Sequence, residues 1–251
     1  MNVDIFIPVR LSSTRLPNKC MKNISGKSVL KLLIENLQFS KKIRNIIVCT
    51  TNMKSDDDLI KYLEKEKIMY FCGNEKDILV RYLDAAYKHN TDFIVSVDGD
   101  DIYTDAVHVD KIIDEYENSK SDYVGSKGFP HGYVPVGFKT EALKKICKLK
   151  IANNTETGYR NFFTETKLFK CTYIEPNKNF ENLKNLRLSL DYQEDFELAI
   201  EIHKALGHNF HLEDISELFK RKPELFEITM KLEDRWKQHW SKNVADIILK
   251  I

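Results

Sequence analysis

The sequence lacks the features that mark several large classes of protein. No apolar run approaches the ~20 residues that cross a bilayer, and the N-terminal MNVDIFIPV has neither the basic region nor the cleavage site of a signal peptide. Neither sign of charge is in excess, because 39 Lys and Arg residues stand against 38 Asp and Glu residues. We therefore expect a cytoplasmic protein with no membrane or nucleic-acid partner, in which a local cluster of cations binds any anion.

Paired cysteines and glycine-rich motifs are also missing. The five cysteines are odd in number and form no CxxC pair, and the seven histidines show no metal-ligand spacing. A disulfide framework and a thiolate zinc site are therefore disfavoured. Cys49 and Cys72 lie in strand-like runs, where buried and inert thiols are expected. Neither the Walker loop nor the Rossmann glycine fingerprint is present.

What the sequence does contain is a regular alternation of strand-like and helix-like segments. We predict strands over 4–9, 46–50, 69–72 and 93–97, separated by helices over 27–38, 56–66, 78–88 and 107–116. Ser55 is placed to cap the second of these helices, with Asp58 three residues further on. Such alternation is typical of βαβ units and of a mainly parallel sheet.

The alternation weakens beyond residue 120. Strands are predicted over 123–126, 133–138, 169–174 and 187–190, with helices over 195–206, 215–219 and 225–240. We predict a single α/β domain over 1–251, a Rossmann-like αβα sandwich with a β-rich lobe for acceptor binding or dimerisation at 125–175 and a helical tail at 212–251. Trp236 and Trp240 lie one helical turn apart and are expected in a core or in a dimer interface.

Cations and hydroxyl groups gather directly after the first strand. The segment IPVRLSSTRLPNK contains Arg10, Ser12, Ser13, Thr14, Arg15 and Lys19. Ligands of open parallel sheets bind at the carboxyl ends of the strands, and cations with hydroxyl and backbone N–H donors suit a polyphosphate. The alternative is that these cations are simply solvated.

Aspartates gather after the fourth predicted strand, in VSVDGDD. Asp98, Asp100 and Asp101 stand on the turn, where Gly99 allows a tight bend. Phosphoryl and nucleotidyl transfer use a divalent cation, and Mg²⁺ prefers carboxylate oxygens. The alternative is that such carboxylates cap the following helix, a role expected of Asp101 and Asp105.

The segment at 8–19 resembles the N-terminal signature of the cytidylyltransferases that activate acidic and other unusual sugars. The 3-deoxy-manno-octulosonate cytidylyltransferases and the spore-coat-polysaccharide F-type proteins carry P-A-R-x-x-S-T-R-L-P-x-K, matched here by Pro8, Arg10, Ser13, Thr14, Arg15, Leu16, Pro17 and Lys19. FCGNEKDILVRY, FPHG and RLSLDYQED are similar to further segments of the F-type branch. The resemblance implies a nucleotide-diphospho-sugar transferase-like fold of the GT-A type.

The resemblance also implies roles for individual residues. Pro8, Arg10, Ser12, Ser13, Thr14, Arg15 and Lys19 would hold the triphosphate of CTP, with Arg15 and Lys19 stabilising the departing pyrophosphate. Asp100 and Asp191 would bind Mg²⁺, while Glu194 and Asp195 start the next helix. Thr51, Arg81 and Asp98 are expected to contact the nucleotide, although Asp98 departs from the Gln or Thr of the family.

The acceptor is expected to bind the less regular region near 125–160. His131, Tyr133, Lys139, Tyr159 and Arg160 are the candidate residues. The resemblance implies a homodimeric enzyme that transfers CMP from CTP to an acidic sugar for surface-glycan synthesis. Two alternatives stay open, namely transfer to a phosphate or phosphonate acceptor and a non-catalytic nucleotide-binding protein.

Overall fold

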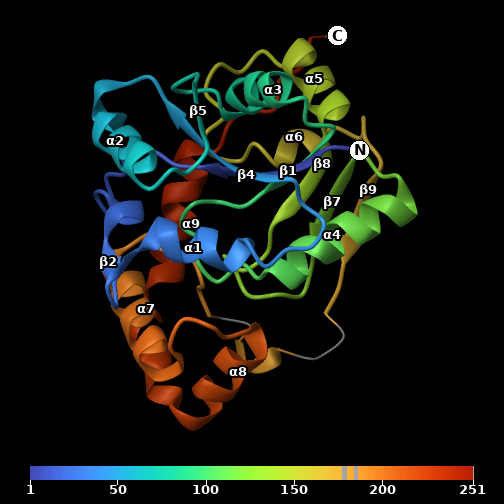
Figure 1. The fold of residues 1–251 in the computed structure, drawn as a ribbon. Helices are drawn as coiled ribbons and strands as arrows, with labels where there is room; N and C mark the ends of the chain where they lie inside the picture. The colour runs from blue at the N-terminus through green and yellow to red at the C-terminus, as the bar shows by residue number, and fades with distance from the viewer. Residues whose placement is uncertain (177–179, 184–185, 251) are drawn as a thin grey trace.

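A seven-stranded sheet forms the centre of the molecule, in the order β5-β4-β1-β6-β8-β7-β9 (Figure 1). The computed structural model describes residues 1–176, 180–183 and 186–250. The strands are β1 (Val3–Pro8), β4 (Asn45–Thr51), β5 (Tyr70–Gly73), β6 (Phe93–Ser96), β7 (Tyr123–Ser126), β8 (Val136–Lys139) and β9 (Cys171–Ile174). The strands β5, β4, β1 and β6 are parallel, β8 is antiparallel to both neighbours, and β9 is parallel to β7. The prediction of an α/β fold with a mainly parallel sheet is confirmed.

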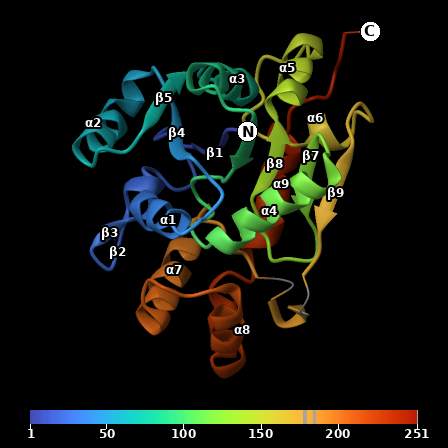
Figure 2. The ribbon, with the colours of Figure 1, turned by 45° about the vertical axis from the view of Figure 1, so that its right-hand side comes forward.

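Helices cover both faces of this sheet, because successive side chains of a strand point to opposite faces. In β1, Ile5 and Ile7 pack with α1 (Val29–Leu37), α2 (Asp57–Lys65) and α4 (Ala106–Ser119). Phe6 packs on the other face with α3 (Ile78–His89), α5 (Thr140–Leu149) and α6 (Asn161–Thr164). Figure 2 shows the two layers on either side of the strands. The central strands are mostly apolar because both of their faces are buried.

The C-terminal helices build a third core. The helices α7 (Gln193–Leu206) and α8 (Leu212–Arg221), with the 3-10 helix η4 (Pro223–Ile228), bury Leu188, Leu190 and Phe219 against Leu32 of α1. They lie together at one end of the molecule in Figures 1 and 2. The last helix, α9 (Leu232–Asn243), is described over its whole length and buries only Leu232. It therefore rests on the protein with few apolar contacts.

Short elements connect the larger ones. A hairpin of β2 (Asn23–Ile24) and β3 (Lys27–Ser28) precedes α1, whose N-terminus is capped by Ser28 accepting a hydrogen bond from Lys31 N at 3.1 Å. The remaining 3-10 helices are η1 (Lys19–Met21), η2 (Lys54–Asp56) and η3 (Glu181–Leu183). All five cysteines are free, with Cys20 and Cys49 buried and the other three half-buried.

Three predicted elements differ from the structure. Residues 187–190 form no strand and make one isolated bridge, between His131 and Arg187, because their leucines are used in the core of the C-terminal helices. The strands at 123–126, 136–139 and 171–174 extend the main sheet and do not form a separate β-rich lobe. The helix predicted over 225–240 is divided into η4 and α9.

Two further differences concern a helix that was not predicted and the cap of α2. The helix α5 follows β8 directly and was absent from the prediction. Ser55 does not cap α2, because it belongs to η2 and Asp56 occupies the N-cap position.

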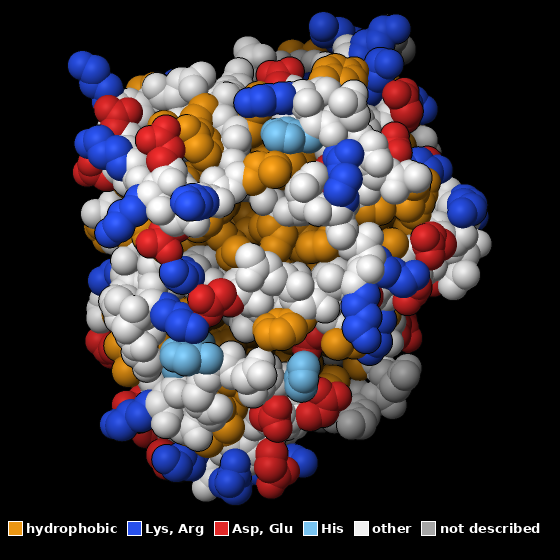
Figure 3. Space-filling model, in the orientation of Figure 1, with side chains coloured by type: hydrophobic (Ala, Val, Ile, Leu, Met, Phe, Trp, Pro, Cys, Tyr) orange, Lys and Arg blue, Asp and Glu red, His pale blue; other side chains and the backbone are white. Residues whose placement is uncertain are grey.

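The surface carries charges of both signs close together. On the face in Figure 3, the Lys and Arg side chains are interspersed with Asp and Glu side chains, as expected for a chain whose net charge is +1. None of the helices in the described part of the chain has the length and apolar content needed to cross a bilayer.

Candidate active site

Most of the polar residues singled out above lie at one edge of the sheet. The parallel strands β5, β4, β1 and β6 all end at this edge, and β8 begins there because Val136 pairs with Ser96. From β1 the chain builds outward through β4 and β5, then returns to β6 on the other side of β1. Such a reversal opens a crevice between neighbouring strand ends. A cavity of about 750 Å³ lies there, lined by residues that follow β1, β5 and β6.

The loop after β1 is fixed at both of its ends. The amide of Leu11 donates a hydrogen bond to Asp56 Oδ1 at 2.8 Å, and Leu16 is buried in the core of the C-terminal helices. Between these two points Ser12, Ser13 and Thr14 line the cavity, as do Pro8, Arg10, Arg15 and Lys19. The residues predicted to hold the triphosphate therefore lie around one cavity, and their role there stays a prediction.

The structure corrects the prediction for Thr51, which is not among the described residues that line the cavity. Its hydroxyl is buried and donates to Asp56, the same carboxylate that holds Leu11. Thr51 therefore supports the loop from behind and does not face a nucleotide.

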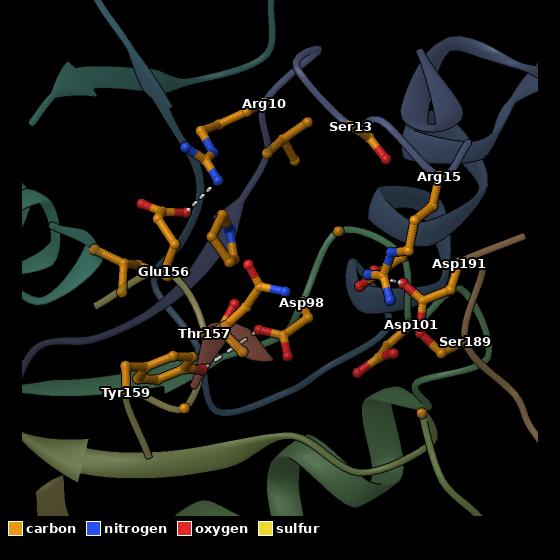
Figure 4. A pocket seen from close by; sticks show the side chains of 18 of the residues that line it. Arg10, Ser13, Arg15, Asp98, Asp101, Glu156, Thr157, Tyr159, Ser189 and Asp191 are labelled. Atoms are coloured by element: carbon orange, nitrogen blue, oxygen red, sulfur yellow. Dashed lines mark hydrogen bonds and ion pairs between the residues drawn. The ribbon is translucent and has the colours of Figure 1, made fainter. Parts of the chain in front are cut away.

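Two carboxylates and two cations meet at the centre of the site. Lys19 Nζ contacts Asp100 Oδ2 and lies 3.5 Å from Asp191 Oδ1, which also accepts a 2.6 Å hydrogen bond from Arg15 Nη2. The backbone brings the two aspartates together, because Leu190 N donates to the carbonyl of Asp100 at 3.0 Å. Figure 4 shows Arg15 and Asp191 facing each other on one side of the cavity.

These contacts set the charge states of the group. Burial alone would lower the pKa of Lys19, but Asp100 and Asp191 outweigh it and raise this pKa. Burial would raise the pKa of Asp191, yet Lys19, Arg15 and Arg187 together hold it below its ordinary value. Lys19 and Asp191 are therefore both charged at neutral pH.

The arrangement fits a magnesium ion that arrives with phosphates. One ammonium group reaches both carboxylates, so a single cation between Asp100 and Asp191 would also reach both. Mg²⁺ is commonly bound by one or two carboxylates together with substrate phosphates and water. No group of three or more His, Cys, Asp or Glu side chains is placed to hold a metal among the described residues.

Arg187 is a site residue that the motif alone did not reveal. Its side chain is 1% exposed, and its Nη2 atom donates a hydrogen bond to Asp191 Oδ2 at 2.9 Å. Its Nη1 atom lies 3.5 Å from Glu233 Oε2. Asp195 accepts hydrogen bonds from the amides of Asp191 and Tyr192, each at 2.9 Å, and so begins α7 as predicted. The position of Asp191 is thereby fixed from both sides.

Gly99 is needed for a close approach of two strands. A Cβ there would lie 2.6 Å from Val9 Cγ2 and 3.0 Å from the carbonyl oxygen of Pro8, while the backbone of Gly99 is outside the left-handed region. The expected tight bend is therefore not the reason for glycine. Contact between the chain after β6 and the chain after β1 is the reason.

The other aspartates of the turn have different tasks. Asp101 does not cap a helix but is buried, and burial together with Asp100 and Asp98 raises its pKa well above the ordinary value. Asp105 does cap α4, accepting a hydrogen bond from Val107 N at 2.6 Å. Asp98 accepts 2.8 Å and 3.3 Å hydrogen bonds from Arg160 and Tyr159.

A second charged group lies on the opposite side of the cavity from Asp191. Glu156 contacts Arg10 Nη2 at 3.2 Å and Arg81 Nη2 at 2.9 Å. Arg81 lines the cavity, but its side chain is 0% exposed and Glu156 lies against it. Figure 4 shows Glu156 and Arg10 facing each other, with Asp98 between them and Asp191.

The candidate acceptor residues divide into two sets. His131, Tyr159 and Arg160 line the cavity. The prediction for Tyr133 is corrected, because this side chain is buried against Phe129 and is not among the described residues that line the cavity. The prediction for Lys139 is corrected as well, because Lys139 lies at the end of β8 away from the cavity and forms an ion pair with Asp122 at 3.1 Å.

The helix α9 contributes an aromatic wall that the prediction missed. Trp236, His239, Trp240 and Asn243 line the cavity, and the two indoles stack with their centroids 5.3 Å apart. The ring of His131 meets Trp236 edge-on at 4.4 Å. The tryptophans therefore face the cavity and not a core, and helical spacing alone could not distinguish the two.

Comparisons with known proteins agree with this geometry. The family model described as Cytidylyltransferase matches residues 5–231. The spore coat polysaccharide biosynthesis protein SpsF of Bacillus subtilis is 22% identical over 214 residues, covering 82% of this chain and 89% of SpsF.

Two solved structures resemble the fold. A cytidylyltransferase from Leptospira borgpetersenii superposes with a TM-score of 0.80 at 28% identity, covering 90% of this chain and 96% of that one. A CMP:2-keto-3-deoxy-manno-octonic acid synthetase complexed with CTP gives a TM-score of 0.62 at 11% identity, covering 82% and 99% of the two chains, and so shows the fold alone. The match over residues 5–231 places this chain in the cytidylyltransferase family.

Proposed function

We propose that this protein transfers CMP from CTP to an oxygen atom of a small acidic sugar and releases pyrophosphate. The observation that carries the proposal is the central group of charges, in which Lys19 touches both Asp100 and Asp191 while Arg15 binds Asp191. The family supplies the donor, since cytidylyltransferases act on CTP. The acidic sugar and its use in surface glycans are supported by the names of relatives, which include 8-amino-3,8-dideoxy-manno-octulosonate cytidylyltransferases and the spore coat polysaccharide biosynthesis protein SpsF.

In this mechanism Arg15 and Lys19 exchange their carboxylate partners for phosphate oxygens. When the triphosphate enters, Arg15 and Lys19 leave the carboxylates and bind the phosphate oxygens, where they stabilise the charge on the departing pyrophosphate. Asp100 and Asp191 would then hold Mg²⁺, which supplies charge neutralisation on the phosphate oxygens. Arg187 keeps Asp191 in position throughout, because it is buried and contacts the other carboxylate oxygen.

The acceptor would bind on the side of α9. There the cavity offers the cation Arg160 for a carboxylate and the indoles of Trp236 and Trp240 for the apolar face of a sugar ring. Ligand sites commonly combine aromatic walls with a few charged groups that fix orientation. Arg160 is bound to Asp98 at 2.8 Å and would share this contact with the acceptor.

The decisive experiment measures pyrophosphate release from each of the four nucleoside triphosphates with Mg²⁺ across acidic sugars, sugar phosphates and phosphonates. Turnover should require CTP and an acidic sugar, and turnover with phosphates or phosphonates alone would favour the alternative acceptor class. The variant Asp100→Asn should lose at least about 100-fold in rate. Asp58→Asn is the matched control, because Asp58 is an exposed carboxylate on α2.

Two outcomes contradict the proposal. Activity that survives Asp100→Asn would show that the central carboxylates are not catalytic. Tight CTP binding without turnover on any acceptor would favour a non-catalytic nucleotide-binding protein. A homodimer and a cytoplasmic location remain predictions, to be tested by analytical ultracentrifugation and by cell fractionation.

A further inference from the structure

Glu156 is a carboxylate that ion pairs hold in place at the end of the cavity away from the central aspartates (Figure 4). Its side chain is 14% exposed and contacts the guanidinium groups of Arg10 and Arg81. Each arginine is fixed in turn by a backbone carbonyl, Arg81 by Asn74 at 2.7 Å and Arg10 by Glu75 at 3.1 Å. Both cations are therefore occupied with positioning this one carboxylate.

The carboxylate still has hydrogen-bonding capacity. Its Oε1 atom is buried against Arg81 Nη2 at 2.9 Å, and its Oε2 atom lies 3.2 Å from Arg10 Nη2. A carboxylate has about four acceptor sites, so these two contacts leave part of its accepting capacity free. Because Glu156 lines the cavity, a ligand that offers an N–H group at this end of the cavity would use that remaining capacity.

The backbone on both sides of Glu156 is fastened. The amide of Thr155 donates to the carbonyl of Lys76 at 3.0 Å, and its hydroxyl donates to Asp77 Oδ1 at 2.8 Å. Gly158 packs so closely on the chain after α9 that a Cβ would lie 2.6 Å from Val244 Cγ2. Glu156 is therefore preorganised before any ligand arrives.

The nucleoside should reach this end of the cavity. Under the function proposed above, the triphosphate lies against Arg15 and Lys19 and the acceptor lies against α9. The base then extends toward Glu156, with Asp98 between the two ends of the site. Cytosine presents an amino group where uracil presents a carbonyl oxygen, and a carboxylate accepts from the first and repels the second.

We propose that Glu156 selects the base, accepting a hydrogen bond from the amino group of cytosine and rejecting uracil. Arg10 and Arg81 position Glu156 through their ion pairs with it and so act on the choice of base as positioning residues. This proposal rests on the proposed function for the placement of the triphosphate. It adds the residue that distinguishes CTP from UTP.

The test is calorimetric binding of CTP and of UTP with Mg²⁺ and no acceptor. The unmodified protein should bind CTP at least about 10-fold more tightly than UTP, because a wrong partner leaves a buried polar group unpaired. In Glu156→Gln the preference should fall to about threefold or less, since an amide can donate to the carbonyl of uracil. Glu141→Gln, an exposed glutamate on α5, should keep the full preference.

A second variant is needed because Glu156→Gln leaves the buried Arg81 without its carboxylate, which could destabilise the protein. Glu156→Asp keeps the charge for Arg81 but withdraws the carboxylate from the base, so the CTP preference should again fall. A preference retained in both variants, or an unmodified protein that binds the two nucleotides equally, would overturn the proposal. The proposed function fails by a different result, namely CTP-selective binding without pyrophosphate release.

Discussion

The buried ion pair between Lys150 and Asp77 provides a measurable test of the structure. Their side chains are only 5% and 6% exposed. Lys150 also donates to the carbonyl of Ala152 at 2.8 Å, and Asp77 caps α3 by accepting from Val80 N at 3.2 Å. The pair thus joins the start of α3 to the segment that carries Glu156.

Replacing Lys150 with Met keeps the volume and removes the charge. Asp77 would then be left buried without its cation, and removing one partner of a buried pair costs about 3–5 kcal/mol. The matched control is Lys61→Met, since Lys61 and its partner Asp58 are 74% and 84% exposed. Loss of that surface pair should cost about 0–1 kcal/mol.

Urea unfolding at pH 7, followed by circular dichroism, measures both free energies of unfolding. A cost of ~4 kcal/mol is a large part of the roughly 5–15 kcal/mol that stabilises a typical protein, so the midpoint should shift clearly. If Lys150→Met and Lys61→Met differ by less than about 1 kcal/mol, the assignment of a buried and charged pair is wrong.

Three further predictions follow from burial, close packing and charge. Burial lowers the pKa of His108 to about 4, below the ordinary value of about 6.5, so its contribution to stability is present above pH 6.5 and is lost as the pH falls toward 4. Between pH 7.5 and 5 the unmodified protein should therefore lose about 2 kcal/mol more than His108→Gln in urea unfolding, and equal losses would refute this. Gly99→Ala places a methyl group 2.6 Å from Val9 Cγ2 and should cost about 1–3 kcal/mol and slow pyrophosphate release, whereas an unaltered rate would contradict the close approach. Lys19→Met should bind Mn²⁺ alone about 10-fold more tightly, because its two carboxylate partners lose their cation, while CMP transfer falls at least about 100-fold. Titration by electron paramagnetic resonance checks the metal affinity, and an unchanged value would show that Lys19 does not compete with metal.

Periodicity of apolar residues predicted the first half of the fold closely. β1, β4 and β6 are buried on both faces, so their sequences are short apolar runs between polar loops. The same signal failed at 187–190, where Leu188 and Leu190 alternate like a strand but pack into the core of α7 and α8. An alternating pattern reports burial and not pairing partners.

The site was predictable where its residues belong to a contiguous motif. The segment containing Arg15 and Lys19 indicated a phosphate loop, and the structure places both residues beside Asp100 and Asp191. Glu156 could not be found this way, because its partners Arg10 and Arg81 are far away in the sequence. From the sequence alone, a single glutamate in a polar segment is predicted to be solvated, and only the fold shows which side chains surround it.

The pairing of charges within the cavity has a consequence for competition among anions in solution. Arg10, Arg15, Lys19 and Arg160 each already contact a carboxylate. Inorganic phosphate or sulfate would have to displace an aspartate or glutamate and leave it unneutralised, so both should inhibit weakly. Under the proposed function, a nucleotide that enters with its own divalent cation would replace both members of a pair at once, so the site would discriminate by total charge balance before it contacts a base or a sugar.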